Sequence, residues 1–277
     1  MALTVMTNPS AIAAQRHLQY TQRGLDKALG HLASGLRIVR SSDDAAGLAI
    51  SESLRSQIRS LGMARRNAHD GISMAQTAEG ALNEVHGMLT RMRELAIQSA
   101  NGTLGTAERT ILNDEFSALR EEIDRIADVT EFNGFLLLDA TATVDLQVGI
   151  YAASENQIEV ALQSAHSADL AAGGGLASAA IDLQANALLA LDVLDEAIGN
   201  VSSIRGAFGV TQNRLEVTID RLHTAEENMT AAESRIRDAD IAAETTLLTR
   251  GQILMQAGVA MLAQANQIPM MGLSLLT

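Results

Sequence analysis

The chain is poor in the side chains that carry most of the reactive chemistry of proteins. Its 277 residues include no Cys, no Trp, two Tyr and four Phe. Without cysteine, disulfides, thiolate metal sites and a cysteine nucleophile are excluded. The scarcity of aromatic residues and a net charge of −13 also argue against a nucleic-acid partner, which would require basic patches and stacking surfaces.

Long apolar runs and targeting signals are missing as well. No stretch approaches the roughly 20 apolar residues needed to cross a bilayer, and a net charge of −13 opposes binding to anionic lipid. The N-terminus lacks the basic-then-apolar order of a secretory signal. We therefore expect a soluble protein with no membrane partner and no conventional export tag.

Sites for catalysis are not apparent either. The six histidines lie at positions 17, 31, 69, 86, 166 and 223. No two of them are three or four residues apart, the spacing that places two imidazoles on one helix face toward a metal. The chain also shows no phosphate-binding glycine loop and no nucleophile elbow. We expect no enzymatic activity, no cofactor and no metal.

Proline is almost absent, and this permits long helices. The only two are Pro9 and Pro269, so nearly the whole chain is free of the strongest helix breaker. Apolar residues at heptad spacing predict one helix over about residues 44 to 99 and a second, longer than 40 residues, running from Leu194 to Ile236. Between them, Thr106 is expected to cap a shorter helix that folds back as a hairpin. The fold class is mainly α, an elongated helical bundle.

Both ends of the chain carry apolar ladders at heptad spacing. The ladders are Leu18, Leu25, Leu32 and Val39 at the front, and Leu247, Leu254, Met261 and Ile268 at the back. A helix with one narrow apolar seam cannot bury that seam alone, so each ladder needs a partner, either the other end or another copy. Basic residues dominate the first forty positions and acidic residues the last forty, which favours paired terminal coiled-coil helices.

A change of period marks a small β element. Apolar residues alternate from Val144 to Ile150 and again from Ile158 to Leu162, which predicts a β-hairpin near residues 140–165. Turn residues precede and follow it, at Asn133-Gly134 and at the glycines 173–175. Two domains are expected: residues 1–40 and 241–277 as the paired terminal helices, and residues 41–240 as the bundle with its hairpin.

Two further features suggest contact surfaces. Arg91, Leu95 and Gln98 are expected to share an outward face of the first long helix. Leu273, Leu275 and Leu276 place apolar side chains at the extreme C-terminus, and exposed apolar residues at a chain end usually indicate a partner.

Several ordered motifs resemble bacterial flagellin, the subunit of the flagellar filament. They are Leu32-Ala33-Ser34-Gly35-Leu36-Arg37-Ile38, the stretch from Ser42 to Ile50, the stretch from Arg66 to Leu82, Phe132-Asn133-Gly134, the stretch from Ser234 to Asp240, and the stretch from Gln264 to Leu276. The resemblance covers nearly the whole chain. Only about 45 residues separate the two helical halves, so it implies a minimal flagellin without outer inserted domains.

The resemblance implies a structural, self-polymerising function in bacterial swimming. In this family the paired terminal helices form the inner tube of a helical filament, here through the two ladders, and the bundle forms a surrounding shell. Export through the flagellar type III apparatus implies an extracellular, secreted location. Implied partners are other copies of the chain, an export chaperone, and cap and hook-associated proteins.

The resemblance also implies contacts with host innate immune receptors. Arg91, Leu95 and Glu115 match positions that a Toll-like receptor recognises in many flagellins. Leu273, Leu275 and Leu276 match a region sensed by cytosolic inflammasome receptors.

Three other interpretations remain. The hook-filament junction protein of the same machinery shares the terminal helices, although its match to residues 67–82 should be poorer. A helical pore-forming protein would need to tolerate anionic membranes, which the charge of −13 opposes. A coiled-coil scaffold would stop at a dimer, whereas a filament subunit would grow without limit.

Overall fold

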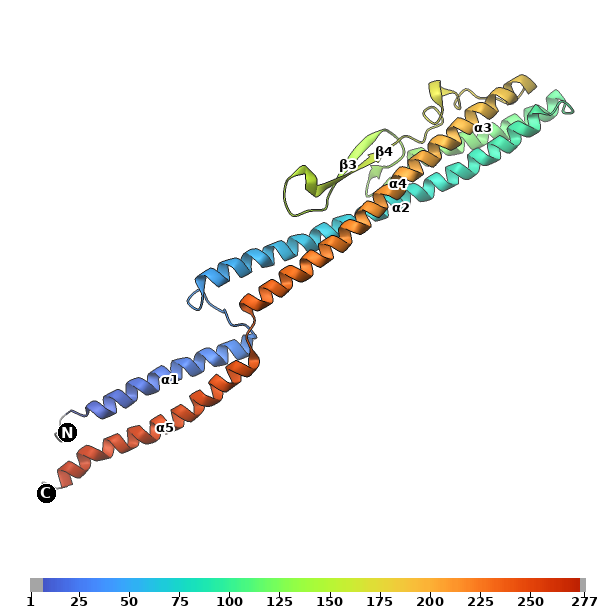
Figure 1. Cartoon of the computed structure of the whole chain (residues 1–277). Coiled ribbons are helices and arrows are strands. Elements are labelled where there is room, and N and C mark those ends of the chain that lie inside the picture. The colour runs from blue at the N-terminus through green and yellow to red at the C-terminus, as the bar shows by residue number, and fades with distance from the viewer. Residues whose placement is uncertain (1–6, 275–277) are drawn as a thin grey trace. The chain divides into compact units, whose positions relative to one another are not determined.

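The computed structural model describes residues 7–274, with side chains from 7 to 267. It is mainly α, as predicted (Figure 1). The helices are α1 (Pro9–Ser34), α2 (Ala45–Ala100), α3 (Thr106–Val129), α4 (Gln184–Arg237) and α5 (Ile241–Ser274). The strands are β1 (Glu131–Phe132), β2 (Phe135–Leu136), β3 (Ala142–Gln147) and β4 (Gln157–Leu162), with short 3₁₀ turns η1 (Ser154–Asn156) and η2 (Ala172–Gly174).

The chain forms two compact units. The terminal unit combines the residues up to Ile58 with those from Glu227 onward, and the central unit is Arg59–Glu226. The long helices α2 and α4 each contribute residues to both units. No described helix combines the length and the apolar character needed to cross a membrane.

Short polar side chains begin three of the helices. The Asn8 side chain accepts a hydrogen bond from the Ala11 backbone N–H, and Pro9 occupies the first turn of α1. Asp44 accepts from the Gly47 N–H at the start of α2, and Asp240 accepts from the N–H groups at the start of α5. Each side chain satisfies backbone donors that have no partner within the helix. Asp44 and Asp240 begin these helices close to the predicted domain boundaries at residues 40 and 240.

The terminal unit is built from α1 and α5, which lie antiparallel (Figure 1). The segments that follow α1 and α4 pair with each other through an isolated β-bridge between Leu36 and Asp238. The Arg37 N–H donates to the Arg237 carbonyl at 2.7 Å, and the Ala239 N–H donates to the Gly35 carbonyl at 3.0 Å. Chain segments some 200 residues apart are therefore held together at the base of the helix pair.

The central unit is a helical bundle around a long main apolar core, with a smaller second cluster beneath the hairpin. Its largest fully buried side chains come from α2, α3, α4 and the segments between α3 and α4. They include Leu82, Leu89, Met92, Phe116, Ile123, Leu137, Leu138, Leu170, Leu176 and Phe208. The predicted hairpin of the first long helix and its shorter successor is confirmed, because Phe116 and Ile123 of α3 share this core with Met92 of α2.

The predicted β-hairpin is also confirmed. Strands β3 and β4 pair antiparallel, with Val144 opposite Val160 and Leu146 opposite Ile158, and η1 forms the turn. Alternate residues of β4 are buried, and Ile158 packs with Ala68 and Leu215 of the long helices. The hairpin therefore covers one side of the bundle. The tighter turn between β1 and β2 uses Asn133 and Gly134, both with positive φ, which suits these two residue types.

Three boundaries differ from the sequence-based prediction. Helix α1 ends at Ser34, because Gly35 adopts a left-handed conformation with φ 71°, so the heptad ladder does not continue on that helix to Val39. Thr106 is the first residue of α3 and not its cap, since Gly105 occupies the cap position. Helix α4 begins at Gln184, ten residues before Leu194, and its 54 residues span about 81 Å.

Candidate assembly interface

Leucines of α1 face glycines of α5. A β-carbon added to Gly258 would lie 3.1 Å from Leu18 Cγ, and one added to Gly251 would lie 3.3 Å from Leu25 Cδ1. The leucines are seven residues apart and so are the glycines, so the same close packing recurs after two helical turns. Leu18, Leu25 and Leu32 are half-buried, consistent with a seam against the other end of the chain.

The ladder predicted at the back of the chain lies outside this seam. The α5 residues shielded against α1 form their own heptad series, Glu244, Leu248, Gly251, Met255, Gly258, Leu262 and Ala265. Leu247, Leu254 and Met261 each precede a member of that series by one position, and their exposed fractions are 54%, 49% and 66%. One residue rotates a side chain by about 100° on a helix, which sets these three beside the seam and not within it. Leu247 and Leu254 line an open groove there together with Tyr20 of α1.

A pair of polar side chains lies at one end of the seam, near the end of α1 and the start of α5. His31 Nδ1 lies 2.8 Å from Glu244 Oε1, and both side chains are largely buried. His31 Nε2 is buried without a hydrogen-bond partner among the described residues. Because a buried polar group is costly unless it is paired, this contact fixes the register in which α1 and α5 lie together.

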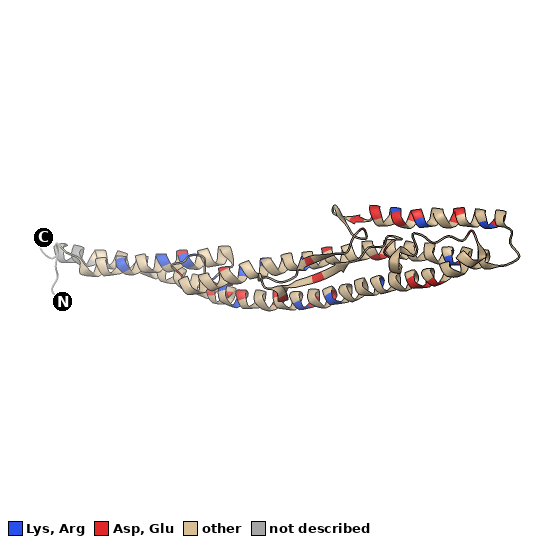
Figure 2. Cartoon of the chain, turned by 90° about the horizontal axis from the view of Figure 1, so that it is seen from above, with Lys and Arg blue, Asp and Glu red and all other residues tan. Residues whose placement is uncertain are grey.

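The outward surface of α5 is unusually apolar. Over its 34 residues only Glu244 and Arg250 are charged, in contrast to α3, where seven acidic and three basic residues crowd 24 positions (Figure 2). Exposed apolar side chains of the terminal unit include Ile12, Tyr20 and Leu29 of α1 and Leu247, Ile253, Leu254, Val259 and Met261 of α5. A helix that is apolar on nearly all sides is normally buried, so this surface is expected to have a partner.

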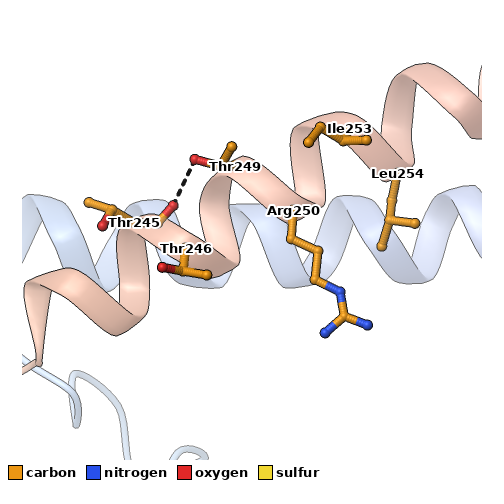
Figure 3. A pocket seen from close by; sticks show the side chains of 6 residues that line it. All are labelled: Thr245, Thr246, Thr249, Arg250, Ile253 and Leu254. Atoms are coloured by element: carbon orange, nitrogen blue, oxygen red, sulfur yellow. Dashed lines mark hydrogen bonds between the residues drawn. The ribbon is translucent and has the colours of Figure 1, made fainter.

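A shallow hollow on α5 lies within this surface. Its lining residues are Thr245, Thr246, Thr249, Arg250, Ile253 and Leu254, all from the one helix (Figure 3). Thr249 donates its hydroxyl hydrogen to the Thr245 carbonyl at 2.9 Å, so this polar group is satisfied within the helix. The hollow therefore presents methyl groups and aliphatic side chains together with one guanidinium.

The remaining predicted assembly residues have different positions. Val39 lies in the connection between α1 and α2 and is 41% exposed. Ile268 belongs to α5, as does Leu273, but their side chains lie outside the described residues. Leu275 and Leu276 are outside the described residues altogether.

The predicted receptor-contact residues do not form one exposed face. Arg91 is exposed and donates to Glu115 Oε1 through its Nε and Nη2 atoms, at 3.0 and 2.8 Å, and to Glu94 at 3.0 Å. These carboxylates raise the pKa of Arg91, Glu115 most strongly. Leu95, in contrast, is 1% exposed within the central core, so its predicted outward orientation is wrong. Elements packed around α2 bury a wider stripe of this helix than a single heptad seam would.

Sequence reasoning missed the inner seam of α5. Gly251 and Gly258 were available as a signal, since two glycines at heptad spacing in an otherwise strong helix indicate a close approach by another segment. The pairing of His31 with Glu244 had no such signal, because residues 213 positions apart meet only after the two ends of the chain have been aligned.

The comparisons with known proteins agree with this architecture. Residues 5–143 match the model of the bacterial flagellin N-terminal helical region, and residues 191–276 match that of the C-terminal helical region. A flagellin of Halalkalibacterium halodurans is 50% identical over 273 residues, covering 97% of this chain and 98% of the relative. A flagellin of Bacillus subtilis is 43% identical over 302 residues, with the same two coverages. Flagellin A of Vibrio anguillarum is 35% identical over 380 aligned positions, covering 100% of both chains.

A solved structure has a similar fold. A flagellar hook-associated protein from Vibrio parahaemolyticus aligns with a TM-score of 0.60 at 15% identity, covering 71% of this chain and 100% of the other. At that identity the likeness concerns the fold alone, whereas the identity to flagellins extends over nearly the full length. The junction-protein and pore-forming interpretations are therefore not favoured, and the family to which these relatives belong is one of structural proteins. The chain belongs to the bacterial flagellin family.

Proposed function

We propose that copies of this chain join through the outward apolar faces of α5 and α1 in the terminal unit. As a flagellin, the chain is a structural subunit that polymerises into the flagellar filament. The proposal concerns which residues form the joints. The observation that supports it is the nearly uncharged α5, with Leu247, Leu254 and Met261 about half exposed or more although another series of α5 residues already packs on α1.

The physical driving force is burial of these side chains. Fully burying one Leu or Met side chain contributes roughly 1.5–3 kcal/mol, so several of them on each copy suffice to drive association. A joint in which the α5 face of one copy meets the α1 face of the next, in one direction only, is heterologous. Repeated heterologous joints that do not close into a ring produce a helical filament.

Polymerisation of purified chains tests the proposal. We expect the double substitution Leu254→Ser and Met261→Ser to leave the monomer helical but to abolish growth from short filament seeds, measured by electron microscopy and sedimentation. Leu189→Ser is the matched control, because Leu189 is 67% exposed on α4 in the central unit. Normal filaments from the double variant would refute the assignment of the joint.

We further propose the finer partners that the resemblance implies. These are an export chaperone, cap and hook-associated proteins, and an extracellular location in the flagellum. Helix α5 supports the chaperone proposal, since a helix so apolar would aggregate before assembly unless it were covered. Co-purification from cells in which polymerisation has been blocked would test it.

A role as a ligand of host innate receptors is a second proposal, supported by the exposed pair of Arg91 and Glu115. We expect Arg91→Ala to weaken signalling in a Toll-like receptor reporter assay. Arg93→Ala is the matched control, since Arg93 is similarly exposed but pairs with Asp195. Leu95 would act only indirectly, by supporting the helix from the core. Full signalling by the Arg91 variant would refute the role. Leu273, Leu275 and Leu276 stay a prediction for cytosolic sensing.

A further inference from the structure

A histidine and three aspartates meet on the central unit. Asp124 and Asp128 come from α3, Asp139 follows β2, and His166 follows β4. Single ligand atoms from Asp128, Asp139 and His166 all lie within 4.8 Å of one another. Two of the carboxylates face the same ring nitrogen, since His166 Nε2 lies 3.1 Å from Asp139 Oδ1 and 3.7 Å from Asp128 Oδ1.

The opposite side of the imidazole is oriented by the fourth residue. His166 Nδ1 lies 3.6 Å from Asp124 Oδ1. The Asp124 carboxylate is itself held by the buried Ser167, whose N–H and hydroxyl donate to it at 2.7 and 2.9 Å. His166 Nε2 and Asp139 Oδ1 form a hydrogen bond at 3.1 Å, which a metal ion bound to Nε2 would replace. The ring proton would then lie on Nδ1, facing the Asp124 carboxylate. This arrangement of carboxylate and histidine is the usual outer support of a metal-binding imidazole.

The backbone around the cluster is fixed independently of any ion. The Ala165 N–H donates to the Leu138 carbonyl at 2.8 Å, which ties together the two segments that carry His166 and Asp139. Leu138 and Ala165 are fully buried. The ligand atoms are therefore presented by an anchored part of the fold, and only the exposed Asp128 and Asp139 side chains would need to rotate to close the site.

Distances and charge both suit a divalent cation. With bonds of about 2.1 Å, neighbouring ligand atoms around a metal are roughly 3.0–3.4 Å apart, close to the separations around Nε2. Three carboxylates against one imidazole leave a net negative charge whether or not the ring is protonated. None of the three aspartates forms an ion pair with Lys or Arg within the described part of the chain. A donor set of one nitrogen and two oxygens suits Zn²⁺ and its neighbours better than Ca²⁺ or Mg²⁺, which prefer oxygen alone.

We propose that Asp128, Asp139 and His166 bind one divalent transition-metal ion, with Zn²⁺ as the representative, and that Asp124 positions the imidazole. Such an ion would join the end of α3 to the segments on both sides of the β3–β4 hairpin. Spacing along the sequence could not indicate this site, because its ligands are 11 and 27 residues apart. The inference concerns the central unit and does not depend on how filaments assemble.

Calorimetric titration of the untagged, EDTA-treated full-length monomer with ZnCl₂ tests the proposal. Burial lowers the pKa of His166, but the neighbouring carboxylates, Asp139 first, outweigh it and leave the pKa above its ordinary value. A proton therefore competes with the metal, and the titration is best made at pH 8. We expect one Zn²⁺ per chain, Ca²⁺ binding at least about tenfold weaker, and a higher melting temperature with Zn²⁺.

Variants separate coordination from unspecific binding. His166→Asn should abolish both the saturable heat and the thermal shift, and Asp124→Asn should weaken binding by about tenfold through loss of orientation. The exposed His69→Asn is the matched control and should bind as the parent chain does. If His166→Asn fails to fold, Asp139→Asn, altered at a side chain that is 44% exposed, gives the same test. No saturable Zn²⁺ binding, or equal binding by a folded His166 or Asp139 variant, would overturn the proposal.

Discussion

Gly71 shows how one missing side chain positions an element. A β-carbon at this position of α2 would overlap Leu146 Cδ1 of the β-hairpin and would lie 3.2 Å from Leu215 Cδ1 of α4. The Leu146 side chain therefore occupies the space that a β-carbon at this position would fill. Sequence reasoning identified the hairpin from its period, but it had no means of telling which helical glycine would receive it.

A pair of glycine substitutions tests this contact. In an open helical position, replacing glycine by alanine stabilises by up to about 1 kcal/mol, as expected for Gly80→Ala, whose β-carbon would meet nothing within 4 Å. Gly71→Ala should instead destabilise by about 1–3 kcal/mol, because overpacking outweighs the gain in helix propensity. Urea denaturation of both variants measures the difference. Equal stabilisation by the two substitutions would show that the hairpin does not pack on α2 in this way.

Asp43 gives the terminal unit a dependence on pH. Lys27 Nζ lies 3.0 Å from its Oδ1, and the backbone N–H of Arg40 donates to its Oδ2 at 3.1 Å. These contacts, Lys27 first, lower the pKa of Asp43 below its ordinary value. A carboxyl whose pKa is lower in the folded state contributes stability above its unfolded pKa, and that contribution is lost as the pH falls through the folded pKa.

Asp43→Asn should therefore melt at a lower temperature than the parent at neutral pH, and the two melting temperatures should converge as the pH falls below about 4. Circular dichroism melts between pH 7 and pH 2 measure this. Lys27→Met should reproduce the loss at neutral pH, since it removes the largest cause of the lowered pKa. A difference that stays constant over the whole pH range would exclude ionisation of Asp43 as its origin.

At the scale of elements, the spacing of apolar residues and the capping residues predicted which helices and strands form. They predicted less well which side of an element packs against its neighbours. The sequence predicted α2 to within one residue at each end, because its apolar stripe is continuous and Asn101-Gly102 follows it. The sequence left open which side of α5 faces α1, since this helix is apolar on most sides and two series one residue apart fit a heptad equally well. Which series meets α1 is decided by the glycines that admit Leu18 and Leu25, a tertiary effect.

The close packing of α1 on α5 at Gly258 can be tested by substitution. Gly258→Leu should force Leu18 out of the seam and separate α1 from α5, whereas Gly24→Leu, at a site with nothing within 4 Å, should not. We expect the Gly258 variant alone to become rapidly cleaved by protease within residues 9–34 and to polymerise poorly. Protection equal to that of the Gly24 control would mean that the close approach at Gly258 is dispensable.

At the scale of the whole molecule, the segment between α3 and α4 determines whether the chain carries a further domain in addition to its helices. It contains two small hairpins and short turns, and it adds no further domain. The alignment with Vibrio anguillarum flagellin A has 380 positions against 277 residues here, so at least 103 positions (380 − 277) have no counterpart in this chain. Long stretches can therefore be absent without loss of the family match.

The corollary is that this segment should accept an inserted domain. Residues 151–155 at the tip of the β3–β4 hairpin are all exposed, and loop tips of this kind tolerate insertions. We expect a small folded domain placed between Ala152 and Ala153 to leave seeded polymerisation intact and to add density at larger radius in averaged electron micrographs. The same domain placed between Thr249 and Arg250 should prevent filaments, because it interrupts the outward face of α5. If the variant with the α5 insertion formed filaments, α5 would not form the joint between copies. If a folded variant with the hairpin insertion formed none, the hairpin would not lie on the outer surface.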